Sequence, residues 1–155
     1  MSTGAPEKFA DCLEELRPWL PLHWKELALF QDRMPLDPMF EIYLAREAAG
    51  ELAMVVLRAD GRMIGYYIGF VAPGLHYKTT LTFTTDIFYI APEHRGRGNG
   101  DLLLGALERE LKRRGVKLAY VGSKNHKPSE FLFTANGYEP CETLFCKWIG
   151  DDHGA

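Results

Sequence analysis

The sequence has few cysteines, and their spacing is uninformative. Its three cysteines form no CxxC pair, so we expect neither a disulfide scaffold nor a cysteine-ligated zinc site. The five histidines show no HExxH or comparable spacing, and we therefore predict no bound metal. An odd number of unpaired thiols fits a reducing compartment, which leads us to expect a cytoplasmic protein.

Long hydrophobic runs and a strong net charge are also missing. The longest apolar run, Met63 to Leu75, is broken by glycines and a proline and is shorter than the ~20 residues of a membrane helix. The first nine residues have no basic segment followed by an apolar one, so we expect no signal peptide and no membrane partner. A net charge of -3 offers no global positive field to nucleic acid, without excluding a local basic patch.

What the sequence does contain is the composition of one ordinary globular domain. Apolar residues make up 46% and charged residues 25% of 155 residues, which argues against disordered and fibrous classes. We see no repeat, linker or low-complexity segment. We therefore treat 1–155 as a single domain with a helical part at 1–50, a sheet-containing core at 52–148 and a tail at 150–155.

The period of the apolar residues separates helices from strands. Helical spacing, with Asp37 as an N-cap for the third element, predicts three helices in the first third of the chain: 6–16, 20–30 and 37–49. Three β-rich segments separated by turn or loop residues then predict an antiparallel meander: 52–58, 63–71 and 80–90.

The second half of the core predicts a crossover. A strongly amphipathic helix over 98–114 stands between the strand at 80–90 and a short apolar strand at 117–122, an order that gives parallel strands. A short helix at 128–136 and a final strand at 138–148 complete the core. The predicted fold class is a mixed α/β (α+β) sheet, antiparallel at first and with one parallel pair, covered by helices on both faces.

One turn in this plan carries chemical information. Residues 95–100, the Gly-rich turn, have glycines at every second position between a strand and a helix. Free N–H groups and the positive dipole end at a helix start bind anions, and Arg95 and Arg97 can add charge-assisted bonds. A Walker loop would need Gly-Lys-Ser/Thr, and a dinucleotide fingerprint would need glycine at Asp101. The alternative is that the glycines only make a tight connection.

The Gly-rich turn also carries a resemblance. Its sequence, Arg-Gly-Arg-Gly-Asn-Gly, resembles the Arg/Gln-x-x-Gly-x-Gly/Ala motif of the GNAT N-acetyltransferase superfamily. Residues 86–93 are similar to the strand before that motif, and 131–138 to the family's late helix ending in Gly-Phe/Tyr. The order of elements agrees from about 52 to 148. Residues 22–29 and 76–78 resemble a branch often found in phages and prophages.

The resemblance implies acetyl-CoA as the co-substrate, bound where two parallel strands splay apart at the Gly-rich turn. The pantetheine arm would pair with the strand ending at Ile90, and the pyrophosphate would lie on the amides of 96–101. Residues 1–50 would then form the acceptor side. The cofactor-binding residues implied in this way are Phe88, Tyr89, Ile90, Arg95, Gly96, Arg97, Gly98, Asn99, Gly100, Asp101 and Phe133.

Acetyl transfer to an amine requires a base, because an alkylammonium, with a pKa near ~10, has no lone pair. Asp86 aligns with a frequent family Glu and, by strand alternation, is predicted on the face of Ile90; an aspartate that is only hydrogen-bonded is the alternative. Phe133 stands where many members have an acidic Tyr. His126, near a family Asn position, is the candidate acid, or else a surface histidine.

The acceptor is the least determined part of the prediction. His76 and Tyr77 follow a long strand and are candidates for binding the substrate, although an ordinary exposed loop is the alternative. We predict direct attack of a primary amine on acetyl-CoA. A protein amine or a modified nucleic-acid base stays open as acceptor, and Phe133 keeps a non-catalytic CoA-binding module open. A homodimer is also open.

Overall fold

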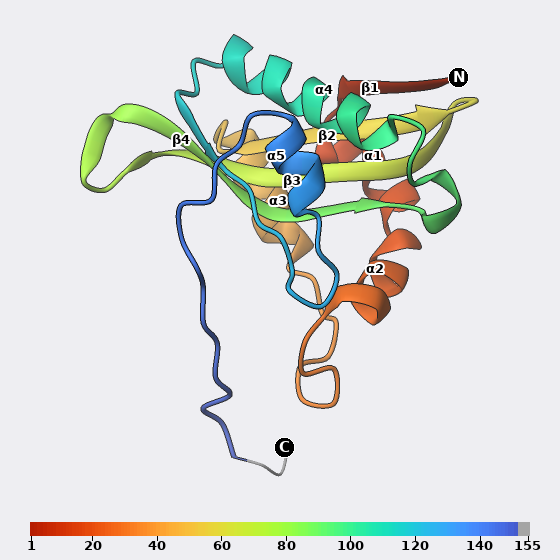
Figure 1. Ribbon diagram of the computed structural model, residues 1–155, viewed down its shortest axis with the longest axis vertical. Helices are drawn as coiled ribbons and strands as arrows, with labels where there is room; N and C mark the ends of the chain where they lie inside the picture. Colours follow the sequence, from red (N-terminus) through yellow and green to blue (C-terminus); the bar gives the residue numbers. More distant parts are fainter. Residues whose placement is uncertain (152–155) are drawn as a thin grey trace.

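The computed structural model, which describes residues 1–151, is built around one five-stranded sheet in the order β1-β2-β3-β4-β5 (Figure 1). The strands are β1 Ser2–Pro6, β2 Leu52–Ala59, β3 Arg62–Gly74, β4 Tyr77–Ile90 and β5 Leu118–Tyr120. Neighbours from β1 to β4 are antiparallel, and β4 and β5 are parallel. The predicted meander with one parallel pair is confirmed.

Helices cover both faces of the sheet, as predicted (Figure 1). One layer holds α1 Phe9–Leu16, α2 Trp19–Leu27 and α3 Phe40–Ala48; the other holds α4 Asn99–Arg113 and α5 Glu130–Ala135, and a short 3-10 turn, η1, spans Pro92–His94. Each layer has its own core, because alternate strand residues point to opposite faces. Tyr66 is buried with Phe9 of α1, whereas the next residue, Tyr67, is buried with Leu107 of α4.

The first strand was not predicted. Ser2–Pro6 consists of small residues and has only Thr3 of the β-branched and aromatic types that mark strands. It pairs with β2 from Ser2↔Ala59 to Pro6↔Val55. Gly4 has no side chain, and a Cβ there would lie 2.9 Å from the Leu102 carbonyl oxygen, so α4 packs directly on this strand. The part at 1–50 is therefore not helical throughout.

Two predicted boundaries in the first half are also wrong. Helix α3 begins only at Phe40, after an N-cap at Met39 that has no side-chain hydrogen bond, so Asp37 is not the cap. The loop expected between the strands predicted at 63–71 and 80–90 belongs largely to the hairpin, because β3 extends to Gly74 and β4 already begins at Tyr77.

The final predicted strand, 138–148, is absent from the described chain. Residues 138–149 form neither helix nor strand, and the segment runs away from the sheet (Figure 1). The predicted tail lies largely outside the described residues. Among residues 1–151, no helix is both long enough and apolar enough to cross a membrane.

Candidate functional site

The parallel strands β4 and β5 separate partway along their length. Their ladder covers only three pairs, from Thr82↔Leu118 to Thr84↔Tyr120. The last link is the Thr85 hydroxyl, which donates to the Tyr120 carbonyl at 3.0 Å. Strand β4 then continues to Ile90, whereas the chain after Tyr120 turns toward α2. The structure therefore contains the predicted splay.

The edge of β4 that faces this opening keeps free backbone groups. The N–H of Ala91 donates to the Ile64 carbonyl at 2.8 Å, which fixes the alternation of bonds between β3 and β4. In an antiparallel ladder every second residue bonds to the partner, so Phe88 and Ile90 point their backbone groups to the other edge. The Ile90 carbonyl accepts from Arg95 Nε at 2.8 Å on that edge. The Phe88 N–H and C=O and the Ile90 N–H remain for an extended ligand.

Asp86 lies on a β-bulge at the start of the opening. Ile87 pairs with Ile68 but Thr85 pairs with Gly69, so Asp86 is the extra residue. Its carboxylate accepts a hydrogen bond from the Tyr43 hydroxyl of α3. The prediction that Asp86 shares a face with Ile90 is wrong, because the bulge shifts the alternation by one residue and Ile90 packs in the opposite layer.

Tyr43 is a site residue that the sequence analysis missed. Burial, and then the carboxylate of Asp86, raise the pKa of Tyr43 well above its usual range, so its hydroxyl stays protonated and donates. Its ring stacks on Phe9, with centroids 5.0 Å apart, and lies 5.9 Å from Phe70. The packing of the helical layer therefore holds the Asp86 carboxylate in place.

The Gly-rich turn has a backbone that only glycines adopt easily. Gly96 and Gly98 have φ angles of 78°, and Arg97 between them has 54°, all in the left-handed region. A Cβ added at either glycine would meet nothing within 4 Å, so the space beside the turn is open. Helix α4 begins directly after Gly98.

This conformation leaves a group of N–H donors without acceptors. Asn99 N–H donates to Gly96 O and Leu102 N–H to Gly98 O. Within residues 1–151, no hydrogen bond uses the N–H of Gly96, Arg97, Gly98, Gly100 or Asp101. These donors lie at the positive end of α4, and the turn therefore has the donors and the polarity of an anion site.

The side chains of the turn mostly hold it in place. Arg95 forms a two-fold ion pair with Glu26 of α2, at 2.5 and 2.7 Å, which lowers the pKa of Glu26. Asn99 Nδ2 donates to the His94 carbonyl at 2.7 Å. The Arg95 guanidinium is thus used within the fold, and among the described residues no ion pair involves Arg97.

The start of α4 is fastened to α5. A Cβ on Gly100 would lie 3.0 Å from Leu132 Cδ1, so glycine is needed for close packing there. The carboxylate of Asp101 accepts from Asn136 Nδ2 at 2.8 Å. Both residues therefore have a free amide at the anion site. The α-carbon of Gly100 packs against α5, and the side chain of Asp101 is hydrogen-bonded to Asn136 after α5.

Two aromatic residues assigned to the cofactor are buried. Phe133 is 5% exposed and lies edge-on to Phe88, with centroids 5.7 Å apart. Tyr89 packs in the opposite layer, where its ring stacks on His23 at 4.9 Å. Phe133 supports the inner wall beside β4, and Tyr89 faces the α1–α3 layer.

The remaining candidates lie apart from one another. His126 Nε2 is 3.1 Å from the Leu27 carbonyl at the end of α2, where it must donate, so it closes the loop after β5 against that helix. His76 and Tyr77 lie in the β3–β4 hairpin, and β4 runs for 14 residues from Tyr77 to Ile90 at the Gly-rich turn. Their role in acceptor binding stays a prediction that no contact in the structure supports.

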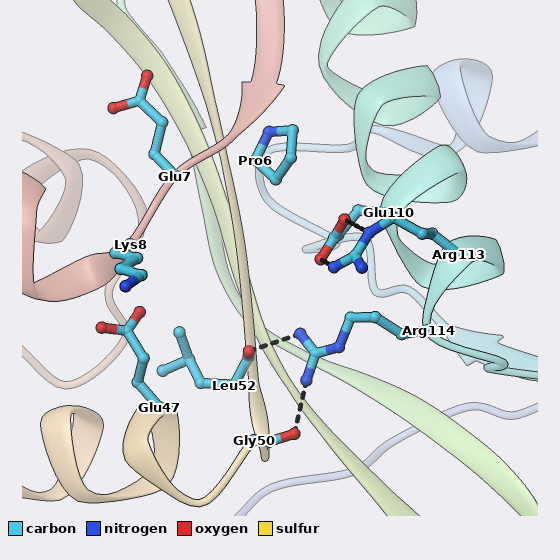
Figure 2. A pocket seen from close by; sticks show the side chains of 9 residues that line it. All are labelled: Pro6, Glu7, Lys8, Glu47, Gly50, Leu52, Glu110, Arg113 and Arg114. Atoms are coloured by element: carbon cyan, nitrogen blue, oxygen red, sulfur yellow. Dashed lines mark hydrogen bonds and ion pairs between the residues drawn. The ribbon is translucent and has the colours of Figure 1, made fainter.

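One hollow in the described chain lies away from this opening. It measures about 420 Å³ and lies between α3, α4 and the end of β1 (Figure 2). Its two arginines already have partners: Arg113 binds Glu110 at 2.7 Å, and Arg114 donates to the carbonyls of Gly50 and Leu52. We interpret it as a structural junction.

A second hollow, of about 360 Å³, adjoins the Gly-rich turn. It is lined by Met1, Ser2, Glu93, His94, Arg97, Asn99 and Leu102. In the described part of the chain, no cluster of three or more histidine, cysteine or acidic side chains could hold a metal ion.

His23 makes the stability of this region depend on pH. Burial lowers the pKa of His23 to about 4, and its Nδ1 is 2.7 Å from the Tyr66 hydroxyl. In the unfolded chain His23 has an ordinary pKa near 6.5, so as the pH falls it binds a proton there before it does in the folded protein. The contribution of neutral His23 to stability is therefore complete above that value and is lost as the pH falls toward 4.

We predict that His23 lowers the free energy of unfolding by about 2 kcal/mol between about pH 7 and 5. Denaturant unfolding at several pH values measures this. His23→Gln should remove that part of the slope, while His76→Gln, at an exposed position, should keep it. An unchanged slope in His23→Gln would show that the proton binds elsewhere.

The fold and the site together define a class. A parallel strand pair that opens beside a free strand edge, with five amides for an anion at its end, suits an extended ligand that carries phosphate. Acetyl-CoA has this form. The model of the acetyltransferase (GNAT) family matches residues 10–138, and the chain belongs to that family. It is an acetyltransferase, and acetyl-CoA is its donor.

Solved structures agree with this fold. A ribosomal-protein-alanine N-acetyltransferase from Brucella melitensis biovar Abortus has a TM-score of 0.75 at 16% identity, covering 97% of this chain and 99% of its own. An aminoglycoside acetyltransferase from an uncultured soil metagenomic sample has a TM-score of 0.75 at 13% identity, with coverage of 97% and 99%. An aminoglycoside N-acetyltransferase in complex with CoA has a TM-score of 0.66 at 16% identity, covering 97% and 100%. Among curated proteins, none matches the sequence.

Proposed function

We propose that the protein transfers the acetyl group of acetyl-CoA to a primary amine by direct attack. The observation that carries the proposal is the position of Asp86, whose carboxylate is exposed on a bulge where the parallel strands begin to open. A base at that point lies beside the expected path of the thioester. The Tyr43 hydrogen bond fixes its orientation.

The donor would be held by the backbone. The five free N–H groups from Gly96 to Asp101 bind the pyrophosphate, and the pantetheine arm pairs with the free edge at Phe88 and Ile90. Arg97 adds a cation beside the turn, whereas Arg95 acts by joining the turn to α2. Phe133 and Phe88 form the apolar wall of the arm.

The reaction then needs three proton and charge movements. The ammonium gives a proton to Asp86, and the neutral nitrogen attacks the thioester carbon. A strand N–H at Phe88 or Ile90 stabilises the negative oxygen that forms. As the C–N bond forms and the C–S bond breaks, the nitrogen releases its second proton to water, and the thiolate leaves unprotonated or takes a proton from water or His126. Phe133 cannot supply that proton.

The acceptor class follows from chemistry and from relatives. The names of similar structures specify a ribosomal-protein alanine and aminoglycosides as acceptors for those proteins. For this chain we propose a cationic amine, either small or at a protein terminus, because the net charge is -3 and the candidate base is a carboxylate. The net charge of -3 favours a modified nucleic-acid base less as the acceptor. We also propose the phage and prophage branch and a cytoplasmic setting, from the motifs and free thiols.

A CoA-binding module without turnover is the second candidate, favoured by Phe133 at the position of the family's acid. Thiol release from acetyl-CoA, corrected for hydrolysis, separates the two when a panel of polyamines, aminoglycosides and peptides is supplied. We expect release to depend on one acceptor class and the acetylated amine to appear in equal amount. Tight CoA binding with no release for any amine would establish the module instead.

A further inference from the structure

The end of α2 contacts both sides of the opening between β4 and β5. On the β4 side, the carboxylate of Glu26 accepts two hydrogen bonds from Arg95, at 2.5 and 2.7 Å. On the β5 side, the Leu27 carbonyl accepts one from His126 at 3.1 Å, in the loop that follows β5 and reaches α2 (Figure 1). The last turn of α2 therefore bridges the opening. Glu26 and the Leu27 carbonyl together are termed the α2 clasp.

The Arg95 guanidinium connects the clasp to the two parts of the donor site. Its Nε donates to the Ile90 carbonyl at 2.8 Å, at the end of the free edge of β4, and Arg95 is also the first residue of the Gly-rich turn. All three guanidinium nitrogens are thus bonded, one to β4 and two to Glu26. Glu26 therefore fixes where the strand edge lies relative to the turn.

The ion pair between Glu26 and Arg95 is stronger than an ordinary surface pair. The side chain of Glu26 is 20% exposed and that of Arg95 42%. Arg95 holds the pKa of Glu26 below its usual range, so the carboxylate is ionised. A guanidinium that binds a carboxylate through two parallel hydrogen bonds has a defined geometry, which single contacts between exposed charges lack.

The helix that carries Glu26 is itself fixed to the sheet. The ring of His23 stacks on Tyr89 of β4, with centroids 4.9 Å apart, and its Nδ1 is 2.7 Å from the Tyr66 hydroxyl of β3. The ring of Trp19 also contacts Tyr89, at 6.3 Å. The clasp therefore has a base that is packed independently of the Gly-rich turn.

The Gly-rich turn needs outside support when no anion is bound. Its residues 96–98 are all left-handed, and Arg97 among them has a side chain, which disfavours that conformation. Its free N–H groups have no acceptor within the described chain until a ligand arrives. A site that is held in its binding form binds more tightly, because the ligand does not have to order it.

We propose that Glu26 is a positioning residue for the donor: through Arg95 it holds the Gly-rich turn in the form that binds the pyrophosphate. Through the Leu27 carbonyl, the same helix end also fixes the loop on the other side of the opening. The proposal rests on the donor site described above and adds the helical layer to it. An ion pair that only kept Arg95 away from the phosphate would have the opposite effect on affinity.

Glu26→Gln tests the proposal, because it keeps the shape of the side chain and removes its charge. Isothermal titration should show a dissociation constant for acetyl-CoA raised about 10-fold. The KM for acetyl-CoA should rise with it, while kcat at saturating donor stays within about twofold of the parent. Because Glu26 acts through Arg95, Arg95→Gln and the double variant of both residues should bind acetyl-CoA equally.

The matched control is Glu110→Gln, at the other end of α4. Glu110 also forms a two-fold ion pair, with Arg113 at 2.8 and 2.7 Å. This variant should lose thermal stability and bind acetyl-CoA as the parent does. Equal losses of affinity in Glu26→Gln and Glu110→Gln would show a general loosening of the fold and would overturn the proposal.

An unchanged or lower dissociation constant in Glu26→Gln would also overturn it. A lower value would show that the ion pair withdraws Arg95 from the phosphate. Gly98→Glu distinguishes this outcome from a failure of the donor site. If Gly98→Glu loses acetyl-CoA and Glu26→Gln does not, the donor site stands without the clasp; if Gly98→Glu binds normally, the donor site itself is wrong.

The unmodified protein provides a second test that does not depend on how the variants fold. Coupling is reciprocal, so a donor whose binding the clasp favours must also stabilise the clasp. The N–H of Ala28 donates to the Trp24 carbonyl at 2.9 Å, at the end of α2. We expect this amide to exchange more slowly with solvent when CoA saturates the protein. Exchange at Ala28 that CoA leaves unchanged would contradict the proposal.

Discussion

Gly98→Glu is expected to lower the affinity for acetyl-CoA at least about 100-fold, because it removes two or more charge-assisted hydrogen bonds to phosphate. The Cβ of residue 98 would enter the open space beside the turn, and the new carboxylate would occupy the place of the pyrophosphate. A negative charge there also repels the ligand directly. Isothermal titration with acetyl-CoA and with CoA measures the loss.

The control for this variant is at the other end of the same helix. Gly115 also has a left-handed φ, of 81°, and a Cβ there would also meet nothing within 4 Å. Gly115→Glu should therefore suffer a similar backbone strain of about 1–2 kcal/mol, visible in thermal unfolding. It should bind acetyl-CoA normally. Equal affinities of the two variants for acetyl-CoA would show that the Gly-rich turn is not the anion site.

Asp86→Asn should lower kcat by about 10² to 10⁴ while leaving the KM for acetyl-CoA near its original value. Asparagine keeps the size of the side chain and can still pair with the Tyr43 hydroxyl, but it cannot take a proton from the acceptor ammonium. Steady-state rates across the pH range, with a saturating amine, measure the effect. The rate of the variant should rise with pH, because a larger fraction of the acceptor amine is then already deprotonated.

Tyr43→Phe is the companion variant, since it removes only the hydrogen bond that orients Asp86. A smaller loss of kcat, with the pH profile retained, is expected. If Asp86→Asn kept the kcat and the pH profile of the parent, Asp86 would be a hydrogen-bonded aspartate of the bulge without a role as base.

The sheet and the anion site were accessible to sequence reasoning because their signals are local. β-branched and aromatic residues marked the strand that ends at Ile90, and the spaced glycines marked the turn that follows. A backbone with left-handed residues and free amides is a property of those few residues, so the structure agrees with the prediction there.

The sequence could not predict the face of the sheet on which Asp86 lies, because a bulge changes the alternation of side chains without changing the composition. No residue type near Asp86 indicates the bulge, in which Ile68 pairs with Ile87 but Gly69 pairs with Thr85. The link to Tyr43 depends on how the helical layer packs on the sheet, 43 residues away along the chain. Contacts of that kind are decided by tertiary packing.

The two errors in strand prediction, the unpredicted strand Ser2–Pro6 and the absent strand at 138–148, have a different physical origin. Ser2–Pro6 has only one β-forming residue, Thr3, and is a strand because β2 pairs with it and α4 packs on it. Residues 138–148 have the composition of a strand but no partner within the described chain. Pairing, more than propensity, decides whether a segment becomes a strand.

The central claim is that the free amides of the Gly-rich turn bind the pyrophosphate of the donor. Titration of the ¹⁵N-labelled protein with CoA, followed by amide NMR, tests it directly. The largest chemical-shift changes are expected at the N–H groups of Gly96, Arg97, Gly98, Gly100 and Asp101. Saturation of the protein with CoA while these amides stay unmoved would contradict it.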